Sequence, residues 1–108
     1  MVIYRGSTEH LELNIDDIEI ADIAEIWFTV TQNKDIKIFK TLADLSTVNG
    51  KLYAVLSQED TLNLVAKSYA YIQSRLLLKN GDAIPTTRKR IYIEDVDKDG
   101  VITAEEEK

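Results

Sequence analysis

A run of acidic residues near the carboxyl terminus has the residue types and spacing of a calcium-binding loop. Calcium takes about six to eight oxygen ligands, and a D-x-D-x-D-G-x5-E loop supplies them from alternate side chains, one main-chain carbonyl and a final glutamate. The glycine of the pattern permits a sharp turn. The matching candidate ligands are Asp95, Asp97, Asp99, Val101 (through its carbonyl) and Glu106. The pattern predicts a calcium site at residues 95–106.

The residues on either side of this loop do not match a helix–loop–helix calcium hand. Residues 87–93 alternate as a strand does, and only two residues follow Glu106. A loop without a rigid frame binds calcium weakly, with a dissociation constant on the order of millimolar. Two interpretations stay open: a weak calcium site, and a simple turn at residues 98–100 in an acidic terminus.

Catalytic chemistry has few residues to use. The sequence has no cysteine, which excludes disulfides, thiolate zinc sites and iron–sulfur clusters. His10 is the only histidine and is expected on the outer side of a strand, and no serine lies in a nucleophile-elbow motif. We therefore predict that the protein is not an enzyme and, calcium apart, has no cofactor.

A second candidate site is an interaction surface on the strand expected at residues 68–78. Alternation places Tyr69, Tyr71, Gln73 and Arg75 on one side of that strand. Tyrosine and arginine are favoured in interface hot spots. The alternative interpretation is that these side chains form the half-polar side of a sheet or a second layer of the core.

The charge of the chain is concentrated near its carboxyl terminus. Residues 94–108 contain seven acids and two bases, so they carry −5 of the formal net charge of −6, and the rest of the chain carries −1. This balance argues against binding to nucleic acid, which depends on neutralising phosphates. The one basic run, Arg88–Lys89–Arg90, is expected to protect an edge strand, with Arg88 and Arg90 on the same face. We predict neither a nucleic acid nor a membrane as partner.

Apolar residues recur with a period of two along most of the chain, which is typical of strands half-buried in a sandwich. Turns are predicted at residues 33–35, 49–50 and 80–82, and a short helix after Ser57, expected to reach about Leu64. Trp27, the only tryptophan, is expected to be largely buried. Together the turns predict an all-β antiparallel sandwich of about seven strands with one short helix. Six of these strands are expected at residues 10–15, 26–31, 36–40, 52–56, 68–78 and 83–93, the last with Pro85 at an edge or bulge.

The length of 108 residues suits one domain, since domains usually span roughly 100–200 residues. We expect the sandwich to occupy residues 1–102 and residues 103–108 to form an acidic, flexible tail. No apolar run approaches the roughly 20 residues that cross a bilayer, and the first residues lack a signal-peptide pattern.

Several segments resemble small prophage-encoded structural proteins of Gram-positive bacteria. They are residues 2–8 (VIYRGST), 26–33 (IWFTVTQN), 56–62 (LSQEDTL), 73–75 (QSR) with 80–82 (NGD), and 98–102 (KDGVI). The likeness covers roughly residues 2–102 and extends to the amino-terminal domains of upper baseplate proteins. The sequence differs from the usual ending of the family at one position. Asp97 stands where an apolar residue is usual, and this aspartate creates the match to the calcium loop.

The resemblance implies an immunoglobulin-like β-sandwich that serves in tail, baseplate or capsid-surface assembly. It implies other virion proteins, or further copies of the chain, as partners. The location it implies is the virion, or the host cytoplasm before assembly. The family has no catalytic residues to transfer.

Overall fold

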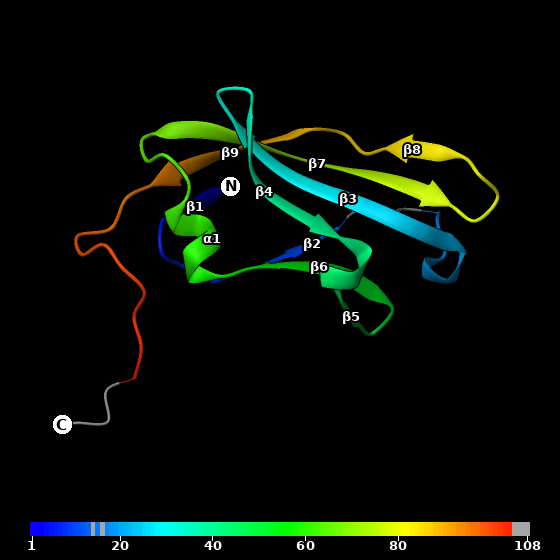
Figure 1. Cartoon of the computed structure of the whole chain (residues 1–108), viewed down its shortest axis with the longest axis horizontal. Helices are drawn as coiled ribbons and strands as arrows, with labels where there is room; N and C mark the ends of the chain where they lie inside the picture. The colour runs from blue at the N-terminus through cyan, green and yellow to red at the C-terminus, as the bar shows by residue number, and fades with distance from the viewer. Residues whose placement is uncertain (14, 16, 105–108) are drawn as a thin grey trace.

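The computed structural model describes residues 1–13, 15 and 17–104, which form two β-sheets packed face to face (Figure 1). Within these residues there are nine strands, one short α-helix and two 3-10 turns. The strands are β1 (Val2–Tyr4), β2 (Glu9–Glu12), β3 (Ile23–Gln32), β4 (Asp35–Thr41), β5 (Ser46–Val48), β6 (Lys51–Leu56), β7 (Ser68–Leu78), β8 (Ala83–Pro85) and β9 (Lys89–Glu94). The helical elements are η1 (Ile20–Asp22), η2 (Leu42–Asp44) and α1 (Gln58–Leu62).

The order of the strands is that of an immunoglobulin-like sandwich. The larger sheet runs β1-β9-β7-β3-β4, with β8 also paired to β7, and the smaller sheet runs β2-β6-β5. Variable-type immunoglobulin domains place their G, F, C and C′ strands in one sheet and their B, E and D strands in the other. The order β9-β7-β3-β4 opposite β2-β6-β5 reproduces this arrangement. The predicted all-β, immunoglobulin-like sandwich is confirmed.

Alternation along the strands determines which side chains form the core. Ile26, Phe28 and Val30 of β3 face inward and are almost completely buried, as are Leu52, Ala54 and Leu56 of β6. β7 contributes Ala70, Ser74 and Leu76 from the same face. Burying an aliphatic or aromatic side chain of this size stabilises a fold by roughly 1.5–3 kcal/mol. The packing of these inward rows fixes the register of the strands, and so fixes which residues face outward.

The predicted turns are present where the sequence places them. Asn33 and Lys34 have φ values of 51° and 70° and join β3 to β4, and Asn49 with Gly50 joins β5 to β6. Ser57 caps α1 through its side chain, which accepts a hydrogen bond from the Asp60 N–H. The helix ends at Leu62, slightly before the expected end.

The expected single strand over residues 83–93 is wrong. It is divided into β8 and β9, because Pro85 has no N–H to continue the ladder. Thr86 replaces the missing pairing: its hydroxyl oxygen accepts a hydrogen bond from the Ser74 N–H at 2.9 Å, and its own N–H donates to the Ser74 carbonyl at 2.8 Å. β8 pairs only with β7, so Pro85 lies on an edge strand as predicted.

Two buried polar side chains tie the connecting loops to the sheets. Gln32, 1% exposed, accepts from the Val65 N–H at 2.7 Å and donates to the Val65 carbonyl at 2.9 Å. Thr61 of α1, fully buried, donates to the Ser7 carbonyl at 2.7 Å. These bonds hold α1 and the loop after it against the ends of β3 and β1.

The two sheets part near β8 and leave a groove of about 290 Å³, with Leu13, Ile18 and Phe28 on its walls and Lys89 among its polar residues. In the part of the chain that the structure describes, no helix is long and apolar enough to cross a membrane.

Candidate interaction surface

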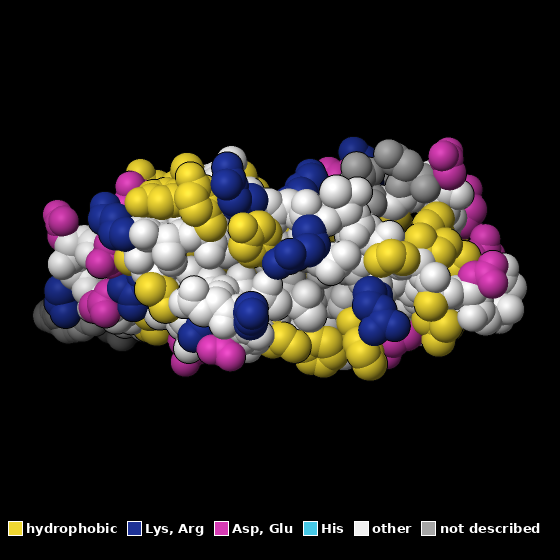
Figure 2. Space-filling view, turned by 90° about the horizontal axis from the view of Figure 1, so that it is seen from above, with side chains coloured by type: hydrophobic (Ala, Val, Ile, Leu, Met, Phe, Trp, Pro, Cys, Tyr) yellow, Lys and Arg dark blue, Asp and Glu magenta, His cyan; other side chains and the backbone are white. Residues whose placement is uncertain are grey.

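The outward side of the larger sheet carries a continuous surface of aromatic and arginine side chains, which we call the aromatic–arginine face. Strand register places its members on the same side of four neighbouring strands. Figure 2 shows hydrophobic side chains interleaved with lysine and arginine over this side of the molecule, with most acidic side chains toward the ends and margins. The face consists of Trp27 and Thr29 (β3), Phe39 (β4), Tyr69, Tyr71, Gln73 and Arg75 (β7), Arg88, and Arg90 and Tyr92 (β9).

One half of the face is built around two tyrosines of β7. The guanidinium carbon of Arg90 lies 4.2 Å from the ring centroid of Tyr69, and that of Arg88 lies 4.2 Å from the ring centroid of Tyr71. Tyr69 also meets the ring of Tyr92 edge to face, at 5.3 Å between centroids. A cation over an aromatic ring contributes about 0.5–1 kcal/mol at an exposed site. These contacts hold each guanidinium over a ring and leave N–H groups available to a partner.

The other half is built around Trp27. The guanidinium carbon of Arg75 lies 5.5 Å from the Trp27 ring centroid, and Trp27 meets Phe39 edge to face at 5.8 Å. Beside Trp27 and Arg75 lies a hollow of about 180 Å³, whose walls include Leu77. An open hollow next to the exposed Trp27 ring can receive an apolar side chain from a partner.

The expectation that Trp27 is largely buried is wrong, since 50% of the side chain is exposed. The inward positions of β3 are taken by Ile26 and Phe28, so alternation turns Trp27 outward. Phe39 is similarly exposed, at 47%. The residue expected to anchor the core is instead one of the largest apolar groups on the surface.

The four residues predicted for the interface all lie on this face. Tyr69 is 48% exposed and Arg75 is exposed, whereas Tyr71 and Gln73 are half-buried. The Gln73 amide donates to the Thr86 carbonyl at 2.9 Å, so it holds the segment between β8 and β9 in place. The alternative of a second core layer does not match this exposure, and binding by the face stays a prediction.

The positive charge of the face is not neutralised within the described part of the chain. The ion pairs formed by residues 1–13, 15 and 17–104 use other cations, namely Arg5, Lys40, Lys51 and Lys67. Glu25 lies at the margin of the face, and its carboxylate accepts from the N–H groups of Leu42 and Ile26, which lower its pKa. Arg75, Arg88 and Arg90 are therefore free to pair with an acidic partner.

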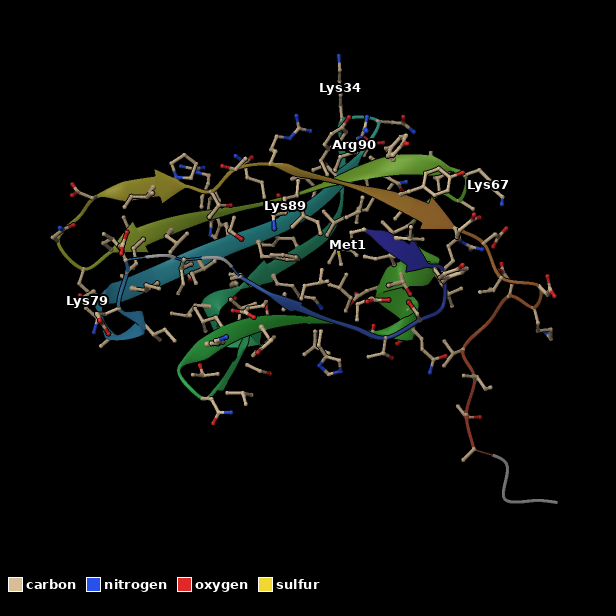
Figure 3. The ribbon with its side chains drawn as sticks, turned by 180° about the vertical axis from the view of Figure 1, so that it is seen from behind. Met1, Lys34, Lys67, Lys79, Lys89 and Arg90 are labelled. Atoms are coloured by element: carbon tan, nitrogen blue, oxygen red, sulfur yellow. The ribbon has the colours of Figure 1, made fainter. Side chains whose placement is uncertain are left out.

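Figure 3 shows how the basic run is divided between the two sides of β9: Arg90 lies above the strand and Lys89 below it. Arg88 and Arg90 thus share a face, as the sequence predicts, but they cover tyrosine rings rather than only protecting an edge. Lys89 lies beside the groove between the sheets.

The predicted calcium loop has a different geometry. One guanidinium nitrogen of Arg5, Nη1, donates to Asp95 at 2.9 Å and to Asp99 at 2.7 Å. Asp97 lies between these two residues in sequence and is exposed, and Glu106 lies outside the described residues. No group of three or more histidine or acidic side chains placed to hold a metal is found among residues 1–13, 15 and 17–104. Calcium binding by Asp95, Asp97, Asp99, Val101 and Glu106 stays a prediction.

Arg5 links the carboxyl-terminal segment to the sandwich. Besides the two aspartates, it donates to the carbonyls of Leu62 and Leu64, and only 16% of its side chain is exposed. Its hydrogen bonds with Asp99 and Asp95 raise the pKa of Arg5 above its ordinary value. The Val96 N–H and the Arg5 guanidinium lower the pKa of Asp95. The charges of this region are therefore largely used within the molecule.

Sequence reasoning missed Arg5, Trp27, Phe39 and the stacking role of Arg88 and Arg90. The alternation of residues 88–92 is visible in the sequence and could have placed Arg88, Arg90 and Tyr92 on one face. Nothing in the sequence relates Arg5 to aspartates about 90 positions away.

Comparisons with known proteins add little to the strand order. No family model and no curated protein matches the sequence. Among solved structures, the chain is similar to the extracellular domain of the voltage-gated sodium channel beta4 subunit, which forms parallel homodimers with a role in cell–cell adhesion. The identity is 12% and the TM-score 0.40, over 97% of this chain and 92% of that one. The fold assignment rests on the order and register of the strands described above.

Proposed function

We propose that this protein is a non-enzymatic structural component of a bacteriophage particle, which joins a neighbouring protein through its aromatic–arginine face. The observation that carries the proposal is the face itself, in which exposed rings and unneutralised guanidiniums lie side by side across four strands. The virion as setting is supported by the resemblance of residues 2–102 to small prophage structural proteins.

The physics of the face suits docking to a protein. Aromatic and arginine side chains supply most of the binding energy of protein interfaces, because they bury large areas and make bidentate hydrogen bonds. Rings and guanidiniums that already pack on one another lose little conformational entropy when a partner arrives. The rigid sheet beneath them adds to this preorganisation.

A calcium-dependent role is not favoured by the geometry at residues 95–99. Two of the candidate ligands already pair with the Arg5 guanidinium, so calcium would have to displace a cation that is anchored by four groups.

The proposed function is tested by incorporation into particles. The bacterium that encodes the chain is induced to release phage, particles are purified, and the chain is quantified with an antibody. We expect a fixed amount of the wild-type chain per particle, and at least a tenfold loss for Tyr69→Ser with Arg75→Ser. Lys51→Ser, at the exposed start of β6 on the smaller sheet, serves as the matched control and should be incorporated normally. Particles that lack the wild-type chain, or that take up the double variant normally, would overturn the proposal.

A further inference from the structure

The molecule is divided into a positive face and a negative end. The aromatic–arginine face presents three guanidiniums, while residues 94–108 hold seven acids and two bases, a net charge of −5. The rest of the chain sums to −1, since −6 minus −5 leaves −1. Each copy of the protein therefore carries both halves of a complementary electrostatic contact.

The negative end leaves the sandwich as an extended segment. After β9 the chain turns away from both sheets and extends beyond the body of the molecule (Figure 1). Ile102 is held by a two-point contact, because its N–H donates to the Gln58 side chain at 2.7 Å and its carbonyl accepts from it at 3.0 Å. The side chains of Val101 and Ile102 are 49% and 79% exposed. The segment thus offers apolar side chains together with its acidic ones.

The segment is poorly placed to cover the face of its own molecule. Its last described contact with the body is at Gln58 on α1, which lies at one end of the sandwich, below the larger sheet and so away from its outward side (Figure 1). The face of a neighbouring molecule can bind the segment without the segment having to fold back around its own sandwich.

We propose that the aromatic–arginine face binds the acidic carboxyl-terminal segment, residues 96–108, of a second copy of this chain. Arg75, Arg88 and Arg90 pair with Asp97 and with the glutamates at 105–107, since Asp99 pairs with Arg5 of its own molecule. The hollow beside Trp27 receives one of the apolar side chains of the segment. Such a contact is head-to-tail, so its repetition produces a ring or an open filament. The inference rests on the docking face proposed above and names its occupant.

The first test is self-association of the purified full-length chain. Sedimentation velocity is measured over a range of concentrations at about 50 mM and about 500 mM salt, where the screening length falls from roughly 14 Å to roughly 4 Å. We expect concentration-dependent association at low salt and at least a tenfold weaker association at high salt. A wild-type chain that remains monomeric under both conditions would overturn the inference.

The second test exchanges the charges of the two partners. In the face variant Arg88→Glu and Arg90→Glu are combined, and in the tail variant Glu105→Lys, Glu106→Lys and Glu107→Lys are combined. Each variant alone should be monomeric, because its face and tail then carry the same sign. An equal mixture should associate again, since the tail of one variant now fits the face of the other.

The control variant combines Lys51→Glu, at the start of β6 on the smaller sheet, with Lys79→Glu, which lies far from Arg90 (Figure 3). It changes the net charge as much as the face variant does and should associate like wild type. Association that survives in the tail variant alone would indicate face-to-face pairing and would overturn the tail as occupant. A monomeric wild-type chain whose face variants are still lost from particles would refute this inference and leave the proposed function standing.

Discussion

The two regions that the sequence singles out use their charges in opposite ways. On the aromatic–arginine face, each guanidinium rests on a ring and its charge is not neutralised within the described part of the chain. At residues 95–99, Asp95 and Asp99 turn toward one guanidinium that is mostly buried. A charge left unpaired on a rigid surface serves recognition, whereas a charge paired internally serves the fold.

The comparison also separates two kinds of arginine. Arg5 donates to two main-chain carbonyls and two carboxylates that come from distant parts of the chain. Arg90 covers Tyr69 on a neighbouring strand. Replacing the first removes connections between elements, and replacing the second removes one surface contact.

Among changes in the two regions, the largest expected effect is the loss of stability in Arg5→Met. The variant leaves the carbonyls of Leu62 and Leu64 without their donor and leaves Asp95 and Asp99 without their counter-ion. We expect it to lower the free energy of unfolding by about 2–3 kcal/mol, measured by urea denaturation. Arg75→Met is the matched control and should cost less than about 1 kcal/mol. Equal losses in the two variants would contradict the distinction between the two regions.

A smaller loss of stability is expected in acid, and it should come from the internally paired carboxylates. The pKa of Asp95 lies below the ordinary value of 3.8. Burial favours a higher pKa for Asp60, but the Ser57 N–H and the Lys40 ammonium outweigh it and lower that pKa too. A lowered pKa in the folded state gives stability that is present above pH 3.8 and lost as the pH falls through the folded value.

The melting temperature should therefore stay nearly constant from about pH 7 to about pH 5 and fall below about pH 4. In Asp95→Asn the fall should be less steep than in wild type, because one of the titrating groups is gone. An unchanged slope in that variant would show that Asp95 does not contribute to the acid response.

Replacements on the aromatic–arginine face should lower the stability of the fold less than the loss of Arg5 does. Tyr69→Ser and Trp27→Ser each remove an exposed ring with its cation contact, worth about 0.5–1 kcal/mol. We expect urea midpoints close to wild type together with normal circular dichroism. Phe28→Ala, on the inward side next to Trp27, should cost about 3–5 kcal/mol. A comparable cost at Trp27 would place that residue in the core.

Much of the fold follows from local sequence signals. Alternation identified the inward rows of β3, β6 and β7, and the turn residues at 33–34 and 49–50 placed two hairpins. Short strands such as β1 and β5 were not predicted, because three residues are too few to show a period. Their positions depend on pairing with distant strands, which local patterns do not encode.

The residues of the candidate sites were predicted where a local pattern places them and missed where a contact joins distant parts of the chain. The period of β7 alone placed Tyr69, Tyr71, Gln73 and Arg75 on one side. The same period does not say which side faces the core, and the aromatic residue at Trp27 was assigned to the wrong side. The calcium-loop pattern is likewise local, whereas its most important neighbour, Arg5, comes from the other end of the chain.

That distant arginine leads to the smallest expected effect, the response to calcium. Bound calcium would stabilise the fold by an amount that grows with the logarithm of the ratio of its concentration to the dissociation constant. Because Asp95 and Asp99 already hold Arg5, we expect about 5 mM calcium to raise the melting temperature by less than about 1 °C. Magnesium at the same concentration is the control for ionic strength. A rise of several degrees that is specific to calcium and abolished by Asp97→Asn would instead establish the loop as a calcium site. Arg5 would then be the cation that calcium displaces, and the two regions would differ less than their geometry indicates.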